Sequence, residues 1–121
     1  MNGAEVFTFT LKRIPQLIKD TLAYSKLNKD EVNHCIFHQA NLFMLKTLAR
    51  SIDINFDKFL ISIDKYGNTS SASIPVTICH NREKIVKNPE KVLMAGFGVG
   101  LSWSAAVSDL KGTIILPILE V

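Results

Sequence analysis

A histidine, an asparagine and a glycine-rich turn stand at three separate places in this chain, and together they could stabilise a negatively charged oxygen. His38 ends an apolar stretch, Asn68 lies beside a glycine in a polar loop, and residues 96–100 read Gly-Phe-Gly-Val-Gly. A neutral imidazole and a carboxamide can both donate hydrogen bonds to a carbonyl oxygen that is becoming an enolate. The glycines would let backbone N–H groups approach a second oxyanion. No convincing nucleophile accompanies them, so the set suggests half of an active site.

Each of these features also has a purely structural explanation. A single histidine at a strand end is more often structural than catalytic, and Asn-Gly turns are common loops. His34 and His80 are assigned structural roles for this reason. No metal site is predicted, because His34 and His38 lack the helical spacing that brings two ligands to one face. The glycine turn also lacks the Lys-Ser/Thr ending of a phosphate-binding loop.

The first third of the chain predicts the elements that would position His38. Apolar side chains repeat at helical spacing over residues 5–24, where Pro15 is expected to kink the helix or delay its start. Asn28 is expected to cap a short helical turn over residues 29–32. A short apolar strand over residues 35–37 then leads directly to His38.

The segment after His38 alternates between predicted helices and strands. Asn41 occupies an N-cap position before a helix that runs to residue 51. A second short strand is predicted over residues 59–63, followed by turn chemistry over residues 65–70. A helix is then expected over residues 71–85.

The last part of the chain predicts a strand over residues 92–95, a tight turn over 96–100 and a returning strand over 101–110. The resulting order of elements indicates one α/β domain, over residues 1–110, whose last two strands form a hairpin. Ligands collect at the carboxyl ends of strands in such domains, so His38 and Asn68 are expected to converge on one pocket. The apolar extension over residues 111–121 is expected to cover an exposed edge or to meet another chain.

Composition limits the classes of protein that fit. The chain has 121 residues, of which 47% are hydrophobic, enough for one compact domain. Its net charge of +3 comes from 14 basic and 11 acidic residues without a basic cluster, which argues against nucleic acid as a partner. Cys35 and Cys79 lie in apolar surroundings and are expected to be buried thiols of a cytoplasmic protein. No signal peptide and no membrane span is predicted.

Taken together, the three segments resemble the β-ketoacyl-acyl carrier protein synthase III family of the thiolase-like superfamily. The resemblance covers nearly the whole chain, from an internal-looking segment over residues 1–7 to the glycine turn. It is most specific at three places, which are His-Gln-Ala-Asn over 38–41, Tyr-Gly-Asn-Thr-Ser over 66–70 and Gly-Phe-Gly-Val-Gly-Leu-Ser-Trp over 96–103. It implies an α/β domain that is one half of a thiolase-like fold, with layered helices and a mixed sheet ending in a β-hairpin.

The resemblance implies a decarboxylating Claisen condensation in fatty acid or related biosynthesis. In that reaction an acyl group moves from a coenzyme A thioester to an enzyme cysteine, and then to malonyl-acyl carrier protein as carbon dioxide leaves. No cofactor is implied. The histidine and asparagine that match His38 and Asn68 stabilise the thioester enolate in that family. Phe97 matches an apolar wall near the reacting carboxylate, and the N–H of Val99, beside Gly98, matches an oxyanion donor.

The start of the second helix carries both a match and a departure. Asn41 matches a residue near the pantetheine arm of the substrate. Family members often have a basic residue at the position of Phe43, where it helps to dock the acyl carrier protein. Lys46 and Arg50 lie one and two turns further on and are candidates to replace it. Glycine is usual at the position of Val99, but a backbone donor survives that change.

The acylated cysteine of the family belongs to an N-terminal half that this sequence lacks. Neither Cys35 nor Cys79 matches it, and strand alternation would place the side chains of Cys35 and His38 on opposite faces. The expected partners are therefore a half carrying the cysteine, acyl carrier protein or coenzyme A thioesters, and a second copy in a homodimeric parent. Two alternatives stay open: a non-catalytic or split half that binds a partner or scaffolds, and a coenzyme A-dependent ketosynthase without carrier protein, which Phe43 favours.

Overall fold

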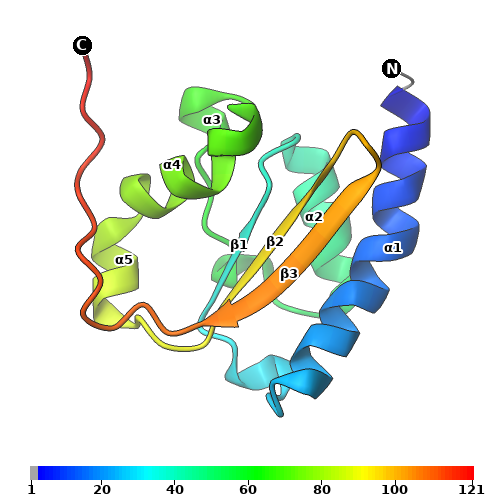
Figure 1. Ribbon diagram of the computed structural model, residues 1–121, viewed down its shortest axis with the longest axis horizontal. Coiled ribbons are helices and arrows are strands. Elements are labelled where there is room, and N and C mark those ends of the chain that lie inside the picture. The colour runs from blue at the N-terminus through cyan, green and yellow to red at the C-terminus, as the bar shows by residue number, and fades with distance from the viewer. Residues whose placement is uncertain (1–2) are drawn as a thin grey trace.

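A three-stranded mixed sheet lies at the centre of the molecule, with helices on both faces (Figure 1). It is seen in a computed structural model that describes residues 3–121, so the first two residues of the family-like opening lie outside the described residues. Strands β1 (His34–Phe37) and β2 (Val92–Gly98) are parallel, and β2 pairs antiparallel with β3 (Ser102–Ser108). The predicted α/β class and terminal hairpin are confirmed.

Alternation along β1 divides the core into two apolar clusters. Cys35 and Phe37 pack with helices α1 (Gly3–Tyr24) and α2 (Leu42–Ile52). Ile36 packs on the opposite face of the sheet, toward helices α4 (Ser73–His80) and α5 (Arg82–Lys87). Figure 1 shows the same division, with α1 and α2 on one side of the strands and α4, α5 and the short α3 (Ile63–Tyr66) on the other. His38 lies two residues after Ile36, so strand alternation places its side chain on the same face of the sheet, toward α4.

Two predicted asparagine caps are confirmed. Asn28 accepts from the N–H of Asp30 and forms a capping box with Glu31 at the 3-10 turn η1 (Lys29–Glu31). Asn41 Oδ1 accepts from the N–H of Met44 at 2.8 Å and so starts α2. An N-cap oxygen satisfies a donor that the first helical turn leaves unpaired, which is why these helices begin where they do.

Helix α1 does not start late. It begins at Gly3 and continues past Pro15, which lies inside it. Proline removes one intrahelical hydrogen bond. The helix tolerates this loss because its apolar side chains are buried against the sheet on both sides of the proline, as Ile14 and Ile18 are.

The predicted strand over residues 59–63 is wrong. Phe59 makes only an isolated bridge to β1, and helix α3 (Ile63–Tyr66) begins where the strand was expected to end. The N–H groups of Ser62 and Ile63 donate to the side-chain oxygen of Gln39, at 3.0 and 3.2 Å, and not to a neighbouring strand. Hydrogen bonds to the buried side chain of Gln39 thus take the place of the strand-to-strand hydrogen bonds that the prediction required.

The helix predicted over residues 71–85 is divided into three pieces. A 3-10 turn η3 (Ser70–Ala72) leads into α4 (Ser73–His80), and α5 (Arg82–Lys87) follows. Asn81 marks the break between the last two, and its side-chain amide donates to two backbone carbonyls. Asparagine competes with helical hydrogen bonds in this way, so the division falls at its position.

The tight turn predicted over residues 96–100 is also too long. Gly96 and Gly98 belong to β2 and pair with Ser104 and Ser102 of β3, and only residues 99–101 form the turn. Gly100 has the positive φ of 138°, and a Cβ there would lie 2.8 Å from Ser102 Oγ. One glycine is therefore required by the turn, whereas the other two have the extended backbone that any residue can adopt.

The apolar tail is anchored at one residue. Ile115 is buried with Ile36 and Ile85, and its carbonyl accepts from Arg82 Nε at 2.9 Å. Other large apolar side chains of the tail are exposed, namely Ile114, Leu116 and Leu119. Ile115 thus belongs to the core, whereas the surface role expected of the tail and the domain boundary after residue 110 stay predictions. Within residues 3–121 no helix is long and apolar enough to cross a membrane.

Candidate active site

His38 follows β1 directly, and its imidazole is held at one nitrogen. Its backbone N–H donates to the carbonyl of Ala95 at 2.9 Å, and Nδ1 lies 2.7 Å from Ser73 Oγ at the start of α4. The edge of the imidazole meets the ring of Phe97, with centroids 5.4 Å apart and planes at 89°. Nε2 makes no hydrogen bond within residues 3–121. Burial lowers the pKa of His38, which favours the neutral imidazole.

A buried polar network supports the loop that carries His38. The side chain of Gln39 is fully buried, donates to the carbonyl of Phe37 at 2.8 Å and accepts from the two N–H groups at the start of α3. Ser62 Oγ lies 2.7 Å from Thr77 Oγ1, and Thr77 Oγ1 donates to the carbonyl of Ser73 at 2.7 Å. The network ties β1, α3 and α4 together, so the backbone on both sides of the imidazole is fixed.

Asn68 lies in the exposed loop between α3 and η3. Its Oδ1 accepts from the N–H of Ser70 at 2.9 Å, which leaves the amide NH2 without a partner in the described part of the chain. Gly67 and Ser70 on either side both have positive φ, of 69° and 54°. The loop thus fixes the oxygen end of the Asn68 amide and leaves its donor end free.

Phe97, Gly98 and Val99 were all expected in the turn, but they lie in three different environments. Phe97 is buried against His38, and Gly98 pairs with Ser102 at the end of β2. Val99 is the first residue of the turn, and its side chain is 67% exposed. The large apolar residues that follow, Leu101 and Trp103, are also exposed.

The start of α2 brings together Asn41 and Phe43. The Asn41 side chain is exposed, and its cap uses only the oxygen. The ring of Phe43 is 64% exposed and stacks on Phe7 of α1, with centroids 5.9 Å apart. Lys46 lies over the ring of Phe56, and Arg50 is exposed one turn further on. Both cations are exposed and line a hollow that also contains Phe56.

Neither cysteine has the character of a nucleophile in this site. Cys35 is fully buried in the cluster on the α1 side, and burial raises its pKa to about 12. The thiolate is the reactive form, so Cys35 is inert near neutral pH. Its side chain lies on the face of the sheet opposite Ile36, in agreement with the predicted alternation. Cys79 is half-buried near the end of α4, and the hydrogen bond of the His38 ring within residues 3–121 goes to Ser73 and not to this thiol.

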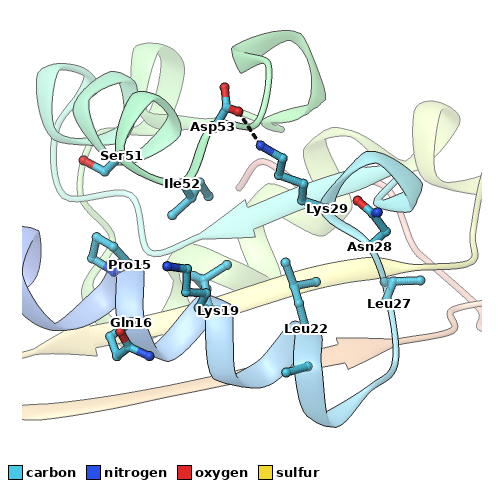
Figure 2. Close-up of a pocket in the computed structure, with 12 residues that line it drawn as sticks. Pro15, Gln16, Lys19, Leu22, Leu27, Asn28, Lys29, Ser51, Ile52 and Asp53 are labelled. Atoms are coloured by element: carbon cyan, nitrogen blue, oxygen red, sulfur yellow. Dashed lines mark hydrogen bonds and ion pairs between the residues drawn. The ribbon is translucent and has the colours of Figure 1, made fainter.

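A separate hollow of about 610 Å³ lies between α1 and the end of α2 (Figure 2). Figure 2 shows the ion pair of Lys29 and Asp53 at its upper side and Leu22 at its floor. None of the predicted site residues lines it. Within residues 3–121 no three His, Cys, Asp or Glu side chains are grouped so that they could hold a metal ion.

The sheet, its hairpin and the layered helices have the arrangement of one half of a thiolase-like fold, and comparisons with known proteins identify the family. Residues 22–110 match the family described as 3-oxoacyl-[acyl-carrier-protein (ACP)] synthase III C terminal. The chain therefore belongs to this family. It is 36% identical over 110 residues to the β-ketoacyl-[acyl-carrier-protein] synthase III of Streptococcus pyogenes serotype M5, which covers 88% of this chain and 34% of the relative.

Solved structures agree with this assignment. The 3-oxoacyl-(acyl-carrier protein) synthase of Burkholderia xenovorans LB400 is similar at a TM-score of 0.89 and 42% identity, over 98% of this chain and 34% of that one. The priming β-ketosynthase of the R1128 polyketide pathway is similar at a TM-score of 0.73 and 26% identity, over 97% and 34%. The chain thus spans about a third of the length of these relatives.

Sequence reasoning did not find the polar side chains that hold the histidine. From the sequence alone, no role is assigned to Ser73, Gln39, Ser62 or Thr77. One signal was available: Ser73 and Thr77 are four residues apart on a helix whose other side chains are largely apolar. Polar residues on a buried helical face need partners, so this spacing predicts a hydrogen-bonded contact.

Proposed function

We propose that this chain is the C-terminal domain of a decarboxylating Claisen-condensing acyltransferase of the 3-oxoacyl-acyl carrier protein synthase III type. The carrying observation is the state of His38, whose Nδ1 is engaged by Ser73 while Nε2 has no partner within residues 3–121. Asn68 is in a comparable state, because its oxygen is engaged and its NH2 is not. Two neutral donors left open in this way suit an oxygen that becomes negative during a reaction.

The proposed chemistry needs no proton transfer by either residue. When the carboxylate of a malonyl thioester leaves as carbon dioxide, the electron pair of the broken C–C bond moves onto the thioester oxygen as an enolate. His38 and Asn68 would donate hydrogen bonds to that oxygen, and the lowered pKa of His38 keeps the imidazole neutral near pH 7. The enolate carbon then forms a bond to the acyl carbon, and the cysteine thiolate leaves. Phe97 beside His38 would disfavour the charged carboxylate relative to carbon dioxide.

The remaining site residues have roles that follow from the same proposal. The backbone N–H of Val99 would stabilise the oxyanion formed as the acyl carbon is attacked, and Gly98 leads the strand to that position. The NH2 of Asn41 would meet the pantetheine arm, since only the oxygen of its side chain is used by the cap. These assignments distribute the donors over the ends of β1 and β2, the loop between α3 and η3 and the start of α2.

The nucleophile must come from another half in this proposal. Cys35 is buried with a raised pKa, and the relatives are about three times as long as this chain. Large apolar side chains are exposed at the hairpin turn and at the start of α2, where a covering half would meet them. We infer that a cysteine-bearing N-terminal half completes the site, in a parent that assembles as a homodimer.

The test is reconstitution with the N-terminal two thirds of the Burkholderia xenovorans synthase. In the reconstituted protein, His38→Ala and Asn68→Ala should each lower the rate of carbon dioxide release from a malonyl thioester by about 10² or more, as expected for an enolate donor. His80→Ala and Asn88→Ala are the matched controls, because both residues are exposed and outside the site. Near wild-type rates for the two site variants would remove the proposed function.

A second candidate is a ketosynthase that takes coenzyme A thioesters without a carrier protein. The exposed Phe43, stacked on Phe7, favours it, because the usual basic docking residue is absent there. Replacing both Lys46 and Arg50 by alanine separates the two candidates. A loss seen only with carrier-bound malonyl substrate supports docking by these cations, whereas equal rates on both substrates support the coenzyme A enzyme. If this chain binds the N-terminal part but the complex releases no carbon dioxide from either substrate, the chain is instead a non-catalytic half.

A further inference from the structure

Ser73 is the only side chain within residues 3–121 that hydrogen-bonds to the imidazole of His38. Its hydroxyl is 1% exposed and lies 2.7 Å from Nδ1. The same hydroxyl oxygen receives a longer hydrogen bond, of 3.4 Å, from the backbone N–H of Gln39. Ser73 therefore joins the imidazole to the backbone of the next residue in the chain.

The hydrogen bonds of the Ser73 hydroxyl determine whether Ser73 Oγ or His38 Nδ1 donates in the contact between them. A serine hydroxyl has one hydrogen to donate and two lone pairs that accept. Gln39 N–H occupies one lone pair, and the only other atom bonded to Ser73 Oγ within residues 3–121 is His38 Nδ1. If Nδ1 carried the proton, the buried hydroxyl hydrogen would have no acceptor, which costs free energy. If Nδ1 is bare, every group is satisfied and the proton of the neutral ring lies on Nε2.

The surrounding contacts keep the hydroxyl in place. Thr77 Oγ1 donates to the carbonyl of Ser73 at 2.7 Å, so its oxygen accepts from Ser62 Oγ at 2.7 Å. All three side chains are at most 1% exposed. The directions of these bonds are thus consistent with one another, and the serine has no room to turn toward solvent.

We propose that Ser73 is a positioning residue that holds His38 in the neutral tautomer protonated at Nε2. This inference rests on the proposed function of His38 as a donor, and it adds the residue that makes that donor available. With the other tautomer, Nε2 would present a lone pair to the enolate oxygen and would repel it. Ser73 itself touches no reacting atom in this account.

The tautomer can be measured in this chain alone, so the test does not depend on activity. Nitrogen-15 spectra of the histidine rings distinguish a protonated ring nitrogen from a bare one. Above the pKa of the imidazole, the wild-type chain should show His38 protonated at Nε2. In Ser73→Ala the population protonated at Nδ1 should increase by about fivefold, which corresponds to a hydrogen bond worth about 1 kcal/mol.

Two further variants keep the test decisive. Thr10→Val removes a buried hydroxyl of α1 that donates to the carbonyl of Val6 and lies outside the network around Ser73, so it should leave the tautomer unchanged. Ser73→Cys keeps the shape but replaces a strong donor with a weak one, so it should give an intermediate population if Ser73→Ala does not fold. A wild-type ring protonated at Nδ1, or equal populations in wild type and the Ser73 variants, would overturn the inference. If His38→Ala kept near wild-type activity in the reconstituted protein, the proposed function would fail, but the measured tautomer of His38 would still test the role of Ser73.

Discussion

The loop that carries His38 and the hairpin turn that carries Val99 are built in opposite ways. Around His38 the supporting side chains, those of Gln39, Ser62 and Ser73, are at most 1% exposed and hydrogen-bonded. At the turn the side chain of Val99 is 67% exposed, and large apolar neighbours are exposed with it. The chain thus fixes its own hydrogen-bond donors but does not cover them. This contrast supports the proposal that a second, cysteine-bearing half covers the turn.

The largest stability effect is expected at the centre of the buried network. Gln39→Leu keeps the volume but leaves two N–H groups and one carbonyl without partners, at a cost of about 3 kcal/mol in the free energy of unfolding. Urea unfolding measures it. Gln16→Leu is the matched control, because that glutamine is exposed on α1 and should change stability by less than about 0.5 kcal/mol. A loss below about 1 kcal/mol for Gln39→Leu would contradict the role of this network.

The exposed hairpin turn predicts that isolated chains associate with one another. Leu101 and Trp103 expose apolar surface at the hairpin, and Phe43 does so at the start of α2. The isolated chain should therefore self-associate or bind an apolar dye, and changing Leu101 to serine should weaken both effects. Light scattering and dye fluorescence report them. Val86→Ser, at an exposed apolar residue of α5, is the control that should change neither. A monodisperse monomer that binds no dye would show that this surface needs no cover.

The smallest expected effect is a dependence of stability on pH. Burial lowers the pKa of both His34 and His38 from the usual 6.5, so the unfolded chain takes up protons first on acidification. Stability is then complete above about pH 6.5 and falls as the pH is lowered through that value. The carboxyl groups of Glu31 and Asp53, whose pKa values are lowered by hydrogen bonds, act only in more acidic solution.

Urea midpoints measured from about pH 7.5 down to pH 5 test this expectation. The decline should become shallower in His38→Gln, whereas His80→Gln, at an exposed histidine, should retain it. A wild-type midpoint that is constant over this range would show that His34 and His38 do not favour their neutral forms.

Local signals in the sequence predicted the elements well where one residue type decides the backbone. The caps at Asn28 and Asn41, the short strand before His38 and the terminal hairpin were all confirmed. Prediction failed where distant side chains decide. The expected strand at Ile63 became a helix because Gln39, more than 20 residues earlier, accepts the N–H groups that a strand would have used. Periodicity within a segment cannot reveal such a competitor.

The candidate site divides in the same way. His38 and Asn68 were selected because the residues around them match motifs of a family. In the structure His38 Nδ1 and Asn68 Oδ1 are hydrogen-bonded, and the atoms expected to donate to substrate are not. Ser73 was missed because 34 residues and a change of element separate it from the loop that it supports. The roles of the predicted site residues stay predictions. So do the domain boundary after residue 110 and the cysteine-bearing partner.

The measurement that tests the central claim most directly is a double-mutant cycle in the reconstituted protein. If His38 and Asn68 donate to the same enolate oxygen, each alanine variant lowers carbon dioxide release by about 10², and the double variant loses less than the product of the two. Two single variants with near wild-type rates would contradict the account. So would fully multiplicative losses, because they would mean that the two residues act independently.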